Sequence, residues 1–245
     1  MNTVTLETTD GVAVLTLCDA EHRNRITLDM AARIEDAVAT AAAADDVYAV
    51  VITGAGTAFC AGADRHLLAR ADETSLRAVY RAFVAVRECS LPTVAAVNGP
   101  AVGAGLNLAL SCDVRVAAQS AFFDPRFLQV PIHPGGGHLW MLERLVGRQT
   151  AAAMVMLDQA LDADRALHVG LVWAVVPDGE AAHRSVELCH RLSGSPTPGL
   201  ARQIKATLNA TADLANHSEA VEYELREQLA STRTAEYRTR MGAAG

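Results

Sequence analysis

Short apolar runs alternate with amphipathic segments along most of the chain. Apolar, partly β-branched runs at 48–52, 93–97 and 114–117 are typical of buried strands. Between them, residues 27–44 and 70–87 place apolar side chains at helical spacing. Further strands are predicted at 121–123 and 172–176, and further helices at 138–146, 150–157, 164–170 and 181–192. Because strands alternate with helices, the pattern predicts a body of the α/β class.

The two ends of the chain depart from this alternation. Near the N-terminus, Asp10-Gly11 separates two alternating runs and predicts a β-hairpin. Near the C-terminus, residues 193–199 are rich in Ser, Gly and Pro, and the charged segments 200–209 and 219–233 predict helices without strands. We therefore expect an α/β body over residues 1–192 and a helical C-terminal region over residues 193–245.

Two glycine-containing turns directly follow predicted strands. The first ends in Phe59-Cys60-Ala61-Gly62-Ala63-Asp64, and the second is Asn98-Gly99-Pro100-Ala101-Val102-Gly103-Ala104-Gly105. A strand, a glycine turn and a helix N-terminus together point free backbone N–H groups and the positive end of a helix dipole at one spot. Such a spot would hold an anion, or an oxygen that becomes one. Taken alone, the second turn fits equally well a helix that is merely packed against a sheet.

The second turn lies in a segment without charged residues, which raises the question of a membrane span. A span needs about 20 apolar residues, and Asn98, Gly99, Pro100 and Asn107 interrupt this segment. A dinucleotide site is also disfavoured, because Asp113 follows the glycines far sooner than the spacing of about 20 residues expected for such a site. We therefore expect neither a span nor a dinucleotide site here.

Composition narrows the class of protein further. The 245 residues carry a formal net charge of -7, with 51% hydrophobic and 20% charged residues, which is typical of a soluble globular protein and argues against nucleic acid as a partner. The five cysteines are widely spaced, without a Cys-x-x-Cys pair, so free thiols in a reducing compartment are expected. Glu7 and Asp10 interrupt any signal-peptide core. These features together predict a cytoplasmic protein.

In their order along the chain, the motifs resemble those of the crotonase (enoyl-CoA hydratase/isomerase) superfamily, and the resemblance covers nearly the whole sequence. The residues that carry it are Arg23-Asn24, the segment from Thr53 to Asp64, the segment from Asn98 to Gly105, the segment from Asp164 to Val176, and Lys205. The resemblance implies a spiral of ββα units with a C-terminal helical region used in trimer formation. It also implies an acyl-CoA thioester as ligand, acyl-CoA (fatty acid) metabolism as the setting, and a homotrimer or a hexamer made of two trimers.

The resemblance gives the two glycine turns a role. The backbone N–H groups of Ala63 and Ala104, beside Gly62 and Gly103, would form an oxyanion hole around the thioester carbonyl. Preorganised N–H donors stabilise the negative charge that an enolate or a tetrahedral intermediate places on that oxygen. Because the donors belong to the backbone, alanine at position 104, where glycine is commoner in the family, does not remove the hole.

The resemblance also implies how coenzyme A is held, as part of the substrate rather than as a tightly bound cofactor. Arg23, Arg25, Arg65 and Lys205 lie at or near family positions that contact CoA, whose phosphates need cations. For each of them, a solvated surface charge is an equally good interpretation. Asp64 matches a family position too, and we interpret it as structural.

Two positions depart from the family pattern. Hydratases of this family use two glutamates, and this chain has Asn107 and Arg126 in their places. Asparagine cannot act as a general base, and arginine is effectively never deprotonated. Asn107 and Arg126 are therefore expected to line the substrate pocket, and the two-glutamate hydration mechanism is not expected.

Other residues would then have to transfer protons. His133 lies in a loop where some members of the superfamily place a catalytic side chain, and imidazole exchanges protons near neutral pH. Asp124 is a second candidate, with His138 and Glu143 behind it. His133 and His138 lack a clear third ligand for a metal site, so no metal is expected.

Three functional hypotheses remain open at this point. The first is an acyl-CoA lyase, isomerase or hydrolase of the crotonase type with relocated catalytic groups. The second is a non-catalytic acyl-CoA-binding or carrier protein that keeps the same fold and the oxyanion hole. The third, a scaffold, is disfavoured because a scaffold would not need two intact donor turns.

Overall fold

The main sheet contains six strands in the spatial order β1-β2-β3-β4-β6-β9. The computed structural model describes residues 3–192 and 198–242. The strands of the main sheet are β1 (Val4–Thr9), β2 (Val12–Leu17), β3 (Ala49–Gly54), β4 (Thr93–Val97), β6 (Val114–Ala118) and β9 (Ala174–Val176). β1 and β2 form the predicted hairpin around Asp10 and Gly11, and every other neighbouring pair is parallel. The prediction of an α/β body is confirmed.

A second, smaller sheet carries part of the candidate site. Its order is β5-β7-β8, with β5 (Ala101–Val102) parallel to β7 (Phe122–Asp124) and β7 antiparallel to β8 (Leu161–Asp162). β5 belongs to the second glycine turn, which the sequence pattern alone treats as a loop. It pairs with β7, so the residues after that strand are brought beside the turn.

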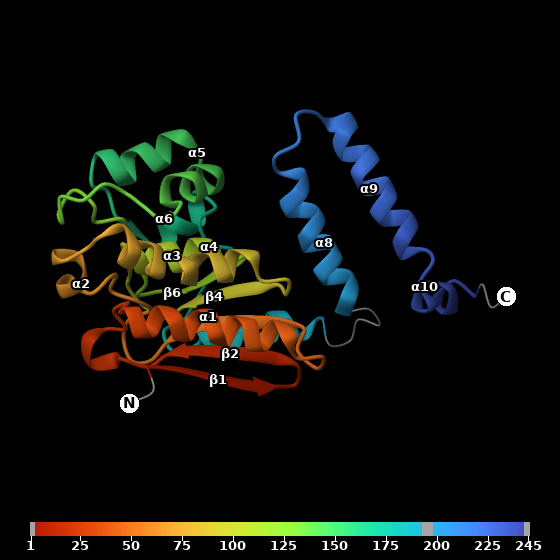
Figure 1. Cartoon of the computed structure of the whole chain (residues 1–245), viewed down its shortest axis with the longest axis horizontal. Helices are drawn as coiled ribbons and strands as arrows, with labels where there is room; N and C mark the ends of the chain where they lie inside the picture. The colour runs from red at the N-terminus through yellow and green to blue at the C-terminus, as the bar shows by residue number, and fades with distance from the viewer. Residues whose placement is uncertain (1–2, 193–197, 243–245) are drawn as a thin grey trace.

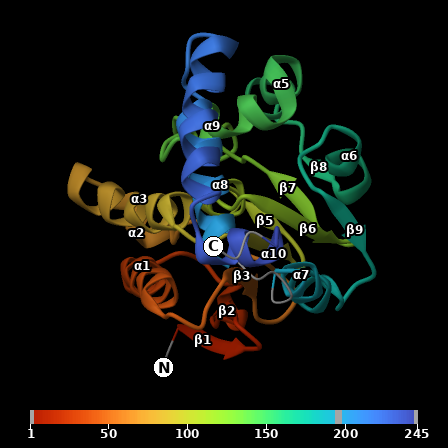
Figure 2. The ribbon, with the colours of Figure 1, turned by 90° about the vertical axis from the view of Figure 1, so that its right-hand side faces the viewer.

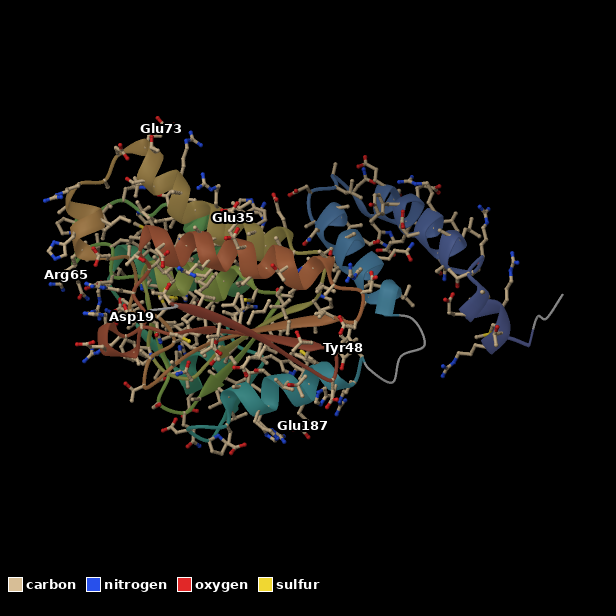
Figure 3. The ribbon with its side chains drawn as sticks, turned by 60° about the horizontal axis from the view of Figure 1, so that its bottom comes forward. Asp19, Glu35, Tyr48, Arg65, Glu73 and Glu187 are labelled. Carbon is tan, nitrogen blue, oxygen red and sulfur yellow. The ribbon has the colours of Figure 1, made fainter. Side chains whose placement is uncertain are left out.

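Helices cover both faces of the main sheet because successive strand residues point to opposite sides. In β3, for example, Val50 and Ile52 belong to one buried apolar cluster while Ala49 and Val51 belong to another. The first cluster lies under α1 (Leu28–Ala43), α3 (Glu73–Glu88), α4 (Ala104–Ser111) and α5 (His138–Met156). The second lies under α7 (Ala181–His190). Figure 2 shows α1 and α7 on opposite sides of β2 and β3, and Figure 3 shows the same arrangement through Glu35 of α1 and Glu187 of α7.

Local capping fixes several helix ends. The hydroxyl of Thr27 accepts a hydrogen bond from the Met30 N–H, as predicted for an N-cap. Asp72 and Ser75 form a capping box, so α3 begins at Glu73 rather than at residue 70. The two helices predicted over 138–146 and 150–157 are joined as α5, with Gly147 in a non-helical conformation between them. The remaining short helices of the body are η1 (Ala20–His22), α2 (Arg65–Ala69) and α6 (Ala163–His168).

Three helices form the described part of the C-terminal region: α8 (Pro198–Thr211), α9 (His217–Ser231) and α10 (Ala235–Arg240). Figure 1 shows them beside the body at the end of the molecule opposite α2. The sequence pattern predicts the first two and misses α10, which is only 6 residues long. Most of the linker-like segment, residues 193–197, lies outside the described residues, so the boundary at residue 192 stays a prediction. Among the helices of the described residues, none is long and apolar enough to cross a bilayer.

Polar contacts fasten α8 to the body. The Lys205 ammonium donates to the backbone carbonyl of Leu91 at 2.9 Å and lies 2.7 Å from the carboxylate of Asp113. The same carboxylate oxygen accepts from the backbone N–H and the hydroxyl of Thr93 at 2.8 and 2.9 Å. Arg202 adds hydrogen bonds to the Ala42 carbonyl in the last turn of α1 and to the Val47 carbonyl before β3. The position of α8 against the body, and the partner of its Lys205 charge, are therefore determined by residues distant in the sequence.

Candidate functional site

Backbone hydrogen bonds hold the two glycine turns against each other. The Cys60 N–H donates to the carbonyl of Pro100 at 3.1 Å, and the Val102 N–H donates to the carbonyl of Cys60 at 2.9 Å. On its other side, the first turn bonds to the segment after η1, since the Ile26 N–H donates to the Gly62 carbonyl at 2.8 Å. The turns thus form one rigid unit at the ends of the parallel strands β3 and β4.

The backbone N–H groups of Ala63 and Ala104 are left without a protein acceptor among the described residues. On either side of Ala63, the Gly62 carbonyl accepts from the Ile26 N–H and the Asp64 N–H donates to the Ile26 carbonyl. The Ala63 N–H points away from this pairing and stays free. Ala104 is the first residue of α4, where N–H groups have no helical partner. The arrangement has the form that the sequence predicts for an oxyanion hole; its function stays a prediction.

Gly62 makes the close approach of the turns possible. Its φ of +101° lies in a region that L residues rarely adopt, and a Cβ built on it would lie 2.9 Å from the Val102 carbonyl oxygen. Gly103, with φ near +50°, caps α4 and donates its N–H to the Asp124 carbonyl at 2.8 Å. The conformation that frees the Ala63 and Ala104 N–H groups therefore depends on both glycines.

A cavity of about 160 Å³ opens in front of these donors. One wall is formed by the two turns, a second by apolar side chains of α2 and α3, and a third by the loop after β7. A larger cavity of about 730 Å³ lies between that loop and α5 and shares Phe127, Ile132 and His133 with the first. The two cavities are thus neighbours across a single loop.

Of the predicted pocket and proton-transfer residues, the structure brings Gly62, Gly103, Asn107, Arg126 and His133 to the smaller cavity. His133 is exposed, and its Nδ1 lies 2.7 Å from the carbonyl of Pro134. Since a carbonyl only accepts, Nδ1 carries the hydrogen of this bond, and Nε2 is the ring nitrogen left to exchange a proton.

Asp124 is placed differently from the expectation that it transfers protons. It is only 4% exposed, and its carboxylate accepts hydrogen bonds from Nε and Nη2 of Arg126 at 2.9 and 2.5 Å. Asp124, the last residue of β7, and Arg126, just after that strand, therefore neutralise each other. Asp124 supports the site instead through its carbonyl, which holds Gly103.

The four predicted CoA-binding cations separate into two groups. Arg65 lines the cavity, and Arg23 is exposed next to the first turn, where its carbonyl accepts from the Ala61 N–H at 2.9 Å. Figure 3 shows Arg65 at the same end of the molecule as Asp19. Arg25 is half-buried and paired with the carboxylate of Asp64 at 2.7 Å.

Lys205 differs from the other three cations in having only buried partners. Its side chain is 8% exposed, and its ammonium pairs with Asp113 and donates to the Leu91 carbonyl, so its expected contact with CoA stays a prediction. The family motif predicts a cation at position 205. It does not predict the ion pair with Asp113, because the two residues are far apart in the sequence. Within the described residues, no cluster of His, Cys, Asp and Glu is arranged to hold a metal ion.

Comparison with known proteins matches this arrangement to a family. Residues 7–244 match the family model described as enoyl-CoA hydratase/isomerase. The chain belongs to the enoyl-CoA hydratase/isomerase (crotonase) family. It is 43% identical over 250 residues to a probable enoyl-CoA hydratase of Mycobacterium tuberculosis, covering 98% of this chain and 96% of that protein. It is 32% identical to the 1,2-epoxyphenylacetyl-CoA isomerase of Escherichia coli, covering 95% and 91%.

Solved structures of the family share the fold. The enoyl-CoA hydratase subunit I of Geobacillus kaustophilus matches with a TM-score of 0.92 at 27% identity, covering 99% of this chain and 94% of that one. A putative enoyl-CoA hydratase of Streptomyces coelicolor matches with a TM-score of 0.90 at 31% identity, covering 99% and 90%. The predicted crotonase fold, with its C-terminal helices, is confirmed.

Asn107, which lines the smaller cavity, forms a buried pair with His138. The His138 Nδ1 donates to the Asn107 side-chain oxygen, and the Asn107 amide nitrogen donates to the Gly135 carbonyl at 2.9 Å. His138 is 1% exposed, lies edge-on to Phe127, and its Nε2 has no partner among the described residues. Burial lowers the pKa of His138 to about 4, so the ring is neutral. The sequence does not predict this pair, because Asn107 and His138 are 31 residues apart and no local pattern links them.

The buried imidazole predicts a pH dependence of stability. The pKa of His138 falls from an ordinary 6.5 to about 4 on folding. The unfolded chain therefore binds more protons below pH 6.5, and stability decreases as the pH falls toward 4. We expect His138 to account for a loss of about 2 kcal/mol in the free energy of unfolding between pH 7 and pH 5. Urea unfolding of wild type and His138→Gln at both pH values measures it, and equal losses in the two proteins would contradict the burial described here.

Proposed function

We propose that the chain is an enzyme that binds an acyl-CoA thioester and holds its carbonyl oxygen between the N–H groups of Ala63 and Ala104. The observation that carries this proposal is that both donors are free and line one cavity. Each donor of this kind contributes roughly 2.7–4 kcal/mol to stabilising a developing oxyanion. Stabilised charge on this oxygen makes the α-carbon of the thioester acidic, so the shared step is formation of an enolate.

His133 is the group we propose for proton transfer at the α-carbon. Its Nε2 is available as a base, and the side chain lies at the wall shared by the two cavities. Asn107 and Arg126 take the places of the two hydratase glutamates, and Arg126 is paired with Asp124. Hydration of an enoyl-CoA by two carboxylates is therefore not part of the proposal.

Arg65 and Arg23 are the cations we propose for the phosphates of CoA. Arg65 lines the mouth of the site and both side chains are exposed, so neither needs to leave a buried pair to bind. The relatives named for acyl-CoA reactions support the same ligand. A homotrimer or hexamer stays a prediction from the resemblance, and a sedimentation mass of three or six chains would bear it out.

A non-catalytic acyl-CoA-binding protein is the second candidate. The observation that favours it is the chemistry of the cavity itself, since Asn107 stands where a base is expected and the nearby carboxylate of Asp124 is tied to Arg126. Such a protein would polarise the thioester carbonyl without moving a proton.

Exchange of the α-hydrogens of butanoyl-CoA in deuterium oxide tests the proposal without requiring knowledge of the final product. We expect wild type to bind butanoyl-CoA and to catalyse exchange, and His133→Ala to reduce the exchange rate by about 10²-fold while binding persists. His183→Ala, which changes an exposed histidine of α7, is the matched control.

Three outcomes separate the candidates. Binding without exchange in wild type identifies the non-catalytic protein. No rise in melting temperature with saturating butanoyl-CoA contradicts both candidates, because a ligand of the native state must stabilise it. Rapid hydration of a short enoyl-CoA, followed by loss of its absorbance, would contradict the exclusion of two-carboxylate chemistry.

A further inference from the structure

The orientation of the Asn107 amide is fixed by its two neighbours. The Gly135 carbonyl can only accept, so the amide nitrogen must face it, at 2.9 Å. The amide oxygen then faces Nδ1 of His138, which donates to it. The cavity wall therefore has a fixed N–H donor at a position where the hydratases of the family have a carboxylate.

One N–H of this amide remains unused. An asparagine nitrogen carries two hydrogens, and among the described residues only the Gly135 carbonyl accepts from it. Asn107 is 3% exposed and lines the cavity. A buried donor without an acceptor is costly, which makes a ligand atom that accepts from it strongly favourable.

We propose that Asn107 determines specificity by donating this hydrogen bond to an oxygen on the acyl group, so that the substrates are acyl-CoA thioesters with an oxygen substituent a few carbons from the thioester carbonyl. The inference rests on the proposed function, because it concerns the acyl end of the same cavity. His138 is a positioning residue in it, since it holds the amide oxygen away from the ligand.

The surroundings favour a neutral oxygen over a carboxylate. Around Asn107 the cavity is lined by apolar side chains, among them Val79, Phe83 and Phe127. Of the two arginines that line the cavity, Arg126 already pairs with Asp124 at 2.5 Å, and Arg65 is the cation proposed for the CoA phosphates. A carboxylate buried here would lack a free partner, whereas an ether, hydroxyl or ketone oxygen needs only the one donor.

Tyr80 provides the matched control. Its hydroxyl lies close to Gly135, where a Cβ would come within 2.2 Å of it, and it also lines the cavity. No protein partner of this hydroxyl is found among the described residues. Tyr80 is therefore a second neutral hydrogen-bond donor at the cavity, beside Asn107, that is able to recognise an oxygen.

Calorimetric dissociation constants for two matched ligand pairs test the proposal. The pairs are methoxyacetyl-CoA with butanoyl-CoA, and 3-methoxypropanoyl-CoA with pentanoyl-CoA; within each, one methylene is replaced by an ether oxygen. We expect wild type to bind at least one ether about fivefold to tenfold more tightly than its alkyl partner. Asn107→Leu should abolish this preference and leave the alkyl affinity within about threefold, whereas Tyr80→Phe should retain it.

The positioning role of His138 has its own signature. His138→Phe should reduce the ether preference without weakening alkyl binding, and His138→Gln, whose amide can donate to the same oxygen, should restore it. A preference that survives His138→Phe would overturn this part of the proposal.

The remaining outcomes are equally decisive. Equal binding of ether and alkyl ligands by wild type overturns the inference and leaves the proposed function intact, and this comparison does not depend on any variant folding. A preference lost in Tyr80→Phe and kept in Asn107→Leu also overturns it. Failure of all four thioesters to bind contradicts the proposed function itself.

Discussion

Gly105→Ala is expected to lower the free energy of unfolding by at least about 3 kcal/mol. The added methyl group would lie 2.2 Å from the carbonyl oxygen of Cys60, a backbone atom that already accepts from the Val102 N–H. Relief requires α4 to move away from the first glycine turn, and the Ala104 N–H would move with it. Urea unfolding monitored by circular dichroism measures the loss.

Gly199→Ala is the control for this substitution. Gly199 also lies in a helix, α8, and nothing comes within 4 Å of a Cβ built on it. It should change stability by less than about 1 kcal/mol, in the stabilising direction because alanine favours helix. If both alanine variants had the same unfolding midpoint, the close approach of α4 to Cys60 would be wrong.

Asp113→Ala is expected to cost about 3 kcal/mol, because it leaves the buried Lys205 ammonium without its counterion. The substitution also removes the hydrogen bonds from Thr93 to the Asp113 carboxylate, which join β4 to the segment before β6. Thermal and urea unfolding of the variant measure the change.

A double-mutant cycle separates the charge from the hydrogen bonds. Lys205→Met in the Asp113→Ala background removes the uncompensated cation and should recover part of the stability, while Lys205→Met alone should be less damaging than Asp113→Ala. Asp113 is itself partly exposed, with 29% of its side-chain surface accessible, so it tolerates losing its partner better than Lys205 does. Strictly additive effects would show that the two residues do not interact.

Features of the fold that depend on neighbouring residues could be predicted from the sequence. The Asp10-Gly11 hairpin and the Thr27 cap are determined by the backbone preferences of a few adjacent residues. Helix ends were less accurate: α3 begins at Glu73 because Asp72 and Ser75 cap it, whereas apolar spacing alone extends to residue 70. The short helix α10 has too few residues to show a period.

In the candidate site too, features that depend on adjacent residues could be predicted, and features that depend on distant residues could not. The donors at Ala63 and Ala104 could be named because the crotonase resemblance implies them, and each lies directly after its own strand and glycine turn. The partners of the charged groups could not, because Asp124 with Arg126 depends on a left-handed backbone at Arg126, and Lys205 reaches Asp113 only after α8 has docked. Asn107 and His138 are 31 residues apart, and nothing in their local pattern couples them.

The oxyanion donors are backbone groups held by glycine conformations and main-chain hydrogen bonds, and this has an evolutionary consequence. Mutations at proton-transferring positions leave such donors in place, so a lineage can lose one reaction before it acquires another and still bind the same class of thioester. In this chain both donors lie free beside Asn107 and Arg126, and the backbone that presents them does not depend on those two side chains. Divergence of reaction within this fold therefore does not require the ligand site to be rebuilt.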